Sequence, residues 1–164
     1  MSCLDTLVKA WSDAHWEYSL ALEGLPDEDL WKRPHPGLLS IGEITGHVVY
    51  WEAQYIFGPA EDPLFVAGHE GPLLHPKFRY YTHSIGNPVV LDLDVAGVLA
   101  EFERVHELAK NAVIALAPQL TDPIPWREGA DWDFQLRYAA FHPAYHAGQA
   151  YSVRHMMGQT TTDN

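Results

Sequence analysis

Apolar side chains recur at steps of three and four residues in four separate segments of the chain. These segments cover residues 4–23, 40–58, 92–118 and 131–158. Such spacing places the apolar side chains on one face of a helix. No segment shows a convincing strand pattern, so the sequence predicts an all-α protein. We expect one domain over residues 1–164, folded as a four-helix bundle.

Residues at the ends of the segments match the signals that start and stop helices. Ser40 and Glu43 have the spacing of a capping box, which is the favoured role of Glu43; the alternative is that it accepts the His47 N–H or acts as a base. Gly58 and Pro59 end the same segment. The last two segments can each begin at one of two capping aspartates, Asp92 or Asp94 and Asp131 or Asp133.

A long connection rich in proline and glycine, residues 58–91, joins the second helix to the third. It is too long for a simple turn within a bundle. It can serve as a crossover that lets the two helices run parallel, or it can line a pocket, and the two roles are compatible. His75 and His83 are interleaved here with Arg79, Tyr80 and Tyr81, which could contact a substrate; ordinary loop surface is the simpler interpretation.

Composition narrows the classes of partner. The net charge of -12 disfavours binding to nucleic acid or to an anionic membrane surface. Cys3 is the only cysteine, so no disulfide can form within the chain. The sequence has neither a signal-peptide pattern nor an apolar run long enough to span a membrane. We therefore expect a cytoplasmic protein, although the charge does not select a substrate.

Histidine is the unusual component, with ten in the chain. His142 and His146 are four residues apart, which puts both on one face of the fourth helix. His47 lies on the apolar stripe of the second helix. Three imidazoles that meet in one core are hard to satisfy by hydrogen bonds alone, whereas one divalent ion satisfies all three. The sequence therefore predicts a metal site at His47, His142 and His146.

Three neutral nitrogen ligands leave coordination positions open, which is the pattern of catalytic rather than structural zinc sites. Imidazole also suits Ni, Cu and Fe, so the sequence does not choose the metal. Pro143 follows the first ligand of the pair, and proline inside a helix removes a hydrogen bond to the carbonyl four residues back. We expect a local kink or widened turn over residues 139–142.

Other polar residues are candidates for supporting roles. Gln149 can orient a ligand or substrate, or it can be a core amide bonded to the backbone. Glu52 can accept the His47 N–H or act as a base, but a solvated or rim carboxylate is the favoured interpretation. His15 and His106 border apolar stripes; a fourth metal ligand is one interpretation, and the edge of the core is the favoured one. No catalytic base or nucleophile is identified.

Two motifs carry a resemblance to a known family. LLSIGEITGH at residues 38–47, followed by Trp51-Glu52, and HPAYHAGQ at residues 142–149 resemble the DinB/YfiT-like superfamily. The resemblance covers nearly the whole chain. It implies a bundle of up-down-down-up topology, often dimeric, in which the same three histidines match the metal ligands. Members of known activity include S-transferases and isomerases that use low-molecular-weight thiols.

Three functional hypotheses follow. The first is a metal-dependent enzyme of the thiol S-transferase or hydrolase type, with an open three-histidine site. The second is a non-catalytic metal-binding or stress-related bundle, which is consistent with the absence of an obvious general base. The third is a metal-free bundle with an interaction role, in which water satisfies the histidines.

Overall fold

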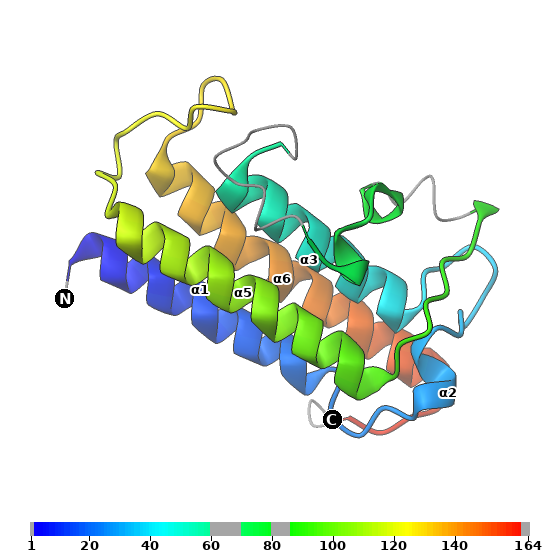
Figure 1. Cartoon of the computed structure of the whole chain (residues 1–164). Helices are drawn as coiled ribbons and strands as arrows, with labels where there is room; N and C mark the ends of the chain where they lie inside the picture. Colours follow the sequence, from blue (N-terminus) through cyan, green and yellow to red (C-terminus); the bar gives the residue numbers. More distant parts are fainter. Residues whose placement is uncertain (1, 60–69, 80–85, 162–164) are drawn as a thin grey trace.

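The computed structural model describes residues 2–59, 70–79 and 86–161, and no β-strand occurs in this part of the chain. The prediction of an all-α protein is confirmed. Four long helices match the four periodic segments (Figure 1): α1 (Cys3–Leu20), α3 (Ile41–Phe57), α5 (Val95–Leu116) and α6 (Trp132–Met156). None of the helices described is long and apolar enough to cross a membrane.

Three short helical pieces were not predicted. They are α2 (Asp27–Leu30) and the two 3-10 turns η2 (Pro72–Leu74) and η3 (Pro76–Phe78). Each is at most one turn long, so none can show a repeating apolar pattern. Both 3-10 turns begin with proline, whose fixed φ suits the first position of a helix.

The capping predictions can be tested at α3, α5 and α6. Ser40 and Glu43 form both hydrogen bonds of the capping box at the start of α3, as predicted. At α5, Asp94 rather than Asp92 is the cap, and its side chain accepts from the N–H of Gly97. At α6, Asp131 rather than Asp133 plays this part. Polar side chains thus satisfy amide groups at helix starts that have no partner within the helix.

The four long helices lie side by side, with α6 packed on α1 and α3, and α3 packed on α5 (Figure 1). Their shared core includes Trp11, Tyr18, Phe102 and Leu136, all of them fully buried. The two 3-10 turns of the long connection lie against α3, and η2 also contacts α5. Since neighbours cover α3 on several sides, most of its residues are buried, including Glu43 and Glu52.

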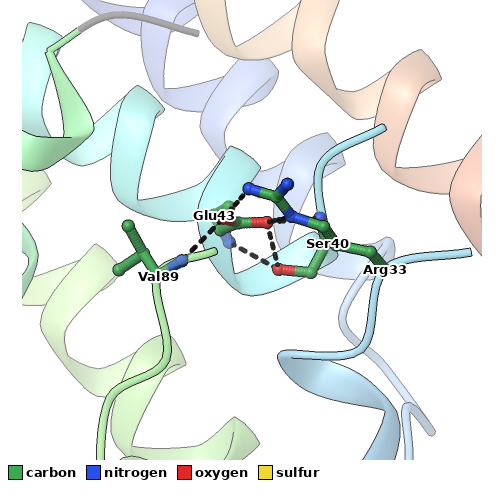
Figure 2. Close-up of polar contacts among 4 residues, drawn as sticks. All are labelled: Arg33, Ser40, Glu43 and Val89. Atoms are coloured by element: carbon green, nitrogen blue, oxygen red, sulfur yellow. Dashed lines mark hydrogen bonds and ion pairs between the residues drawn. The ribbon is translucent and has the colours of Figure 1, made fainter. Parts of the chain in front are cut away.

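One buried polar cluster fixes the start of α3 (Figure 2). The Glu43 carboxylate accepts hydrogen bonds from the Arg33 guanidinium (Nε to Oε2, 2.8 Å), from the Ser40 backbone N–H (2.9 Å) and from the Val89 backbone N–H (2.8 Å). Burial raises the pKa of Glu43, but these donors outweigh it and hold the pKa below its usual value. Glu43 therefore joins three separate segments just one turn before His47.

Candidate metal centre

The structure brings together the three histidines that the sequence singled out. His47 comes from α3, and His142 and His146 come from α6. One ring nitrogen from each lies within 4.8 Å of the others. The Nε2 atoms of His142 and His146 are 3.2 Å apart. His142 and His146 are buried and His47 is partly buried, so the donor atoms converge at the edge of the core.

In two of the rings, a hydrogen bond at one nitrogen determines that the other nitrogen is the one whose lone pair can bind a metal ion. The Nδ1 of His47 lies 3.0 Å from the Phe78 carbonyl oxygen, and the Nδ1 of His146 lies 2.7 Å from Oε1 of Gln149. Both partners are acceptors, so each Nδ1 must carry the proton. The Nε2 lone pair of each ring is then available for an ion, which is how ligating histidines are usually oriented.

The relative orientation of the rings also fits a shared ion. The ring plane of His47 is inclined by 44° to that of His142 and by 74° to that of His146, and the planes of His142 and His146 are inclined by 78°. Lone pairs in the planes of such rings can point to one position. With both nitrogens about 2.1 Å from an ion, the 3.2 Å separation of the α6 pair corresponds to an angle of about 100° at the ion.

Burial keeps the three imidazoles neutral. Burial and then the neighbouring His146 and His47 lower the pKa of His142 to about 3. Burial and His146 lower the pKa of His47 to about 4, and burial lowers the pKa of His146. An imidazole must be neutral to bind a metal. At neutral pH no proton therefore has to leave these rings before an ion can bind.

Pro143 does not interrupt the helix that carries the pair. Helix α6 continues through Pro143 from Trp132 to Met156, and His142 and His146 remain neighbours on one face. The pair therefore keeps the spacing of neighbours on one helix face despite the proline. Proline removes one N–H from the helix, but a long helix packed on two neighbours can retain its course despite that loss.

The three histidines open onto a cavity of about 850 Å³, which lies within the usual range for small-molecule sites. Its walls are aromatic and polar. The lining residues in the described part of the chain are His47, Trp51, Gln54, Tyr55, Pro59, Arg79, Trp126, Arg127, Gln135, Tyr138, Phe141, His142, Tyr145 and His146. Arg79 belongs to the long connection. Its place in the lining supports the prediction that this connection lines a pocket. His75 is exposed and is not part of this lining, while His83, Tyr80 and Tyr81 lie outside the described residues.

Comparison with known proteins places the chain in a family. The family model of the DinB superfamily matches residues 10–150. The chain belongs to the DinB superfamily. No curated protein and no solved structure matches it. Proteins of this superfamily typically bind a metal ion, and the histidine cluster of this DinB protein offers a place for one.

The DinB chain contains a second buried cluster that the sequence analysis did not assemble. His15 of α1, Glu52 of α3 and His106 of α5 are 4%, 4% and 5% exposed. Nε2 of His15 lies 3.2 Å from Glu52 Oε2, and Nδ1 of His106 lies 2.8 Å from Oε1. The interpretation of Glu52 as a solvated rim carboxylate is therefore wrong, and so is the placement of the two histidines at the edge of the core.

The second cluster differs from the first in the orientation of its rings. The His15 and His106 rings are stacked, with centroids 3.9 Å apart and planes inclined by only 16°. Lone pairs that lie in nearly parallel planes cannot converge well on one ion. Each imidazole instead faces its own carboxylate oxygen, and Ser12 Oγ lies 3.3 Å from the other nitrogen of His106. We therefore interpret this cluster as a hydrogen-bonded network.

Charge and burial in the second cluster agree with that interpretation. Burial raises the pKa of Glu52, but His15 and His106 outweigh it and lower the pKa to about 2. Burial lowers the pKa of His15. At neutral pH the carboxylate is thus ionised and accepts hydrogen bonds from two imidazoles.

The sequence did contain an indication that Glu52 is buried. Glu43 and Glu52 are the only charged residues between positions 41 and 57, as expected for a helix buried on most sides.

Proposed function

We propose that this DinB protein is a divalent-metal-binding bundle and a metal-dependent enzyme of the thiol S-transferase or hydrolase type. His47, His142 and His146 would hold one ion. The observation that carries the proposal is the hydrogen bonding at Nδ1 of His47 and His146, which leaves Nε2 of each ring free to bind an ion. Nε2 of His146 lies 3.2 Å from Nε2 of His142, and one ring nitrogen of each histidine lies within 4.8 Å of the others. The donor set suits Zn, Ni, Cu or Fe.

The cavity supports an enzyme rather than a closed structural site. Three protein ligands leave coordination positions open, and all three histidines line the cavity. An ion held there would supply Lewis acidity and would lower the pKa of a bound water or thiol. Gln149 would hold the His146 ring in place through Nδ1, and its amide nitrogen lies 3.3 Å from the Tyr145 hydroxyl.

The finer features expected from the sequence and from the resemblance are part of the same proposal. They are a single domain over residues 1–164, a homodimer, a cytoplasmic location and a low-molecular-weight thiol as substrate. The up-down-down-up topology is supported by the course of the ribbon in Figure 1, where α3 and α5 run in one direction and α1 and α6 in the other. Exclusion of nucleic acid and membrane partners is supported by the net charge of -12.

Elemental analysis tests the metal site directly. Untagged protein purified without a nickel column should contain about one divalent ion per chain, because the three neutral imidazoles form a ready ligand set. The double variant His142→Ala/His146→Ala should lose that ion, whereas His155→Ala, which changes an exposed histidine near the end of the same helix, should retain it. Equal metal content in the wild type and the double variant would overturn the assignment.

A second measurement separates an open site from a closed one. We would replace the ion with Co²⁺ and add a small thiol while recording the visible spectrum. A shift in the cobalt bands shows that an exogenous ligand enters the coordination sphere, as an enzyme requires. Turnover in a thiol-transferase or hydrolase screen should then be lost in His47→Ala; activity that survives this change would rule out the proposed role of the ion.

One observation favours a second candidate, a non-catalytic metal-binding protein. In the described part of the cavity lining there is no aspartate or glutamate that could act as a general base. Burial and contact with Tyr138 raise the pKa of Tyr55, which makes that phenol a poor base as well. This candidate predicts one bound ion but a cobalt spectrum that does not respond to thiol.

Gly46 offers a test of ring orientation that leaves every ligand in place. A Cβ added at Gly46 would lie 2.4 Å from two atoms of the Phe78 ring, which is buried. Gly46→Ala must therefore displace Phe78, whose carbonyl oxygen accepts the hydrogen bond of His47 Nδ1. Loss of such an orienting partner typically weakens metal binding by about 10- to 100-fold. Competition with a zinc chelator measures the change.

Gly148 supplies the matched control on the other helix of the site. A Cβ added there meets no atom within 4 Å. Gly148→Ala should therefore leave zinc affinity unchanged and stabilise α6 slightly, since alanine is the better helix former. If Gly46→Ala binds zinc as tightly as Gly148→Ala, the Phe78 carbonyl does not orient the ligand.

A further inference from the structure

The cavity at the histidine cluster has a charge opposite to that of the protein as a whole. The chain has 22 acidic and 10 basic residues. Within the described part of the cavity lining, however, the ionised side chains are Arg79 and Arg127 alone, with no carboxylate. A small cavity of positive potential in an anionic protein concentrates anions of matching size.

Arg127 is positioned to bind such an anion. It belongs to the loop before α6 and is partly buried. Its Nη1 donates to Oε1 of Gln135 at 3.1 Å, and Gln135 in turn donates to the Tyr55 carbonyl oxygen at 2.9 Å. Arg127 forms no ion pair with any carboxylate that the structure describes. The guanidinium is thus held in place while donors remain for an incoming anion.

Aromatic rings connect Arg127 to the histidine cluster. The guanidinium carbon lies 5.9 Å from the Tyr55 ring centroid and 5.5 Å from that of Tyr138. The same two rings contact His142, with centroid separations of 5.6 Å and 6.1 Å. A flat apolar group between Arg127 and His142 would therefore lie against aromatic surface along its length.

We propose that the cavity binds a small organic carboxylate with a flat apolar body, and that Arg127 pairs with its carboxylate. The planar fork of arginine matches a carboxylate with two parallel hydrogen bonds. The apolar body would lie along Tyr55 and Tyr138 with its far end toward the three histidines. This inference rests on the proposed function, because it names the substrate class of the same site.

The probes are 3-phenylpropanoate and its neutral counterpart 3-phenylpropanamide. Binding is followed by calorimetry on zinc-loaded and on chelator-treated protein, with metal content measured in each sample. We expect the carboxylate to bind about 10-fold or more tightly than the amide, as for a hydrogen bond to a charged group. Arg127→Met should abolish this preference, and Arg127→Lys, which keeps the charge but not the fork, should retain part of it.

Arg137→Met is the matched control, since it removes the same charge from an exposed side chain paired with Asp133 outside the cavity. It should leave the preference unchanged. Equal binding of carboxylate and amide by the wild type, or a preference that survives in folded Arg127→Met, would overturn the inference. Carboxylate selectivity in a protein without metal would contradict the proposed function alone, so the two failures can be distinguished.

Discussion

Glu52→Ala should lower the free energy of unfolding by about 3–5 kcal/mol, because two buried donors each lose an acceptor, at about 1–3 kcal/mol apiece, and a cavity is left behind. The side chain is 4% exposed and accepts hydrogen bonds from His15 and His106. Alanine leaves both imidazoles without their acceptor and opens a cavity where α1, α3 and α5 meet. Chemical denaturation followed by far-UV circular dichroism measures the loss.

Two variants make the Glu52 result specific. Glu52→Gln keeps the size of the side chain, and the Ser12 hydroxyl can accept from His106 Nε2 if that ring changes tautomer, so the expected loss is only about 1 kcal/mol. Glu107→Ala removes an exposed carboxylate paired with Lys110, which should cost less than about 1 kcal/mol. If Glu52→Ala costs no more than Glu107→Ala, the buried network does not stabilise the fold.

The effect of Glu52 also has a defined dependence on pH. Its pKa is lowered to about 2 in the folded protein, so folding favours the ionised carboxylate. The contribution is complete above the unfolded pKa of about 4.3, and it is lost as the pH falls toward the folded value. The difference in unfolding free energy between the wild type and Glu52→Gln should therefore shrink below about pH 4.3.

The helices could be predicted because each has a repeating apolar pattern and a polar residue at its start. Short pieces such as η3 (Pro76–Phe78) could not be predicted, because one turn is too short to show a repeating apolar pattern. Phe78 shows the consequence for the site. Its carbonyl oxygen orients His47 from 31 residues away, and nothing near either residue in the sequence indicates that contact.

The grouping of His47, His142 and His146 could be predicted because two of them share one helix face and all three lie on apolar stripes. The network of His15, Glu52 and His106 could not, because its members come from three helices whose relative rotation the sequence does not define. The place of Arg127 in the cavity could not be predicted for a similar reason. Arg127 lies in the loop between α5 and α6, and only the packing of α6 against α3 brings that loop to the cavity.

Glu43→Ala should also lower the free energy of unfolding by about 3–5 kcal/mol. It removes the acceptor of the Arg33 guanidinium, whose side chain is 8% exposed, and of the backbone N–H groups of Ser40 and Val89. The loss of its carboxylate partner by the buried Arg33 guanidinium is the largest part of this cost. Removing the cation as well, in Arg33→Met/Glu43→Ala, should therefore recover part of the lost stability.

Comparing unfolding curves of the single and double variants tests this account of Glu43. A double variant less stable than Glu43→Ala would show that the lost ion pair of Arg33 is not the main cost. Zinc binding gives an independent check. The contacts of Glu43 reach Arg33, Ser40 and Val89 but none of the three histidines, so Glu43→Ala held at a temperature where it is folded should bind zinc like the wild type. Such a result would mean that Glu43 stabilises the start of α3, while Phe78 and Gln149 orient the rings that would hold the ion.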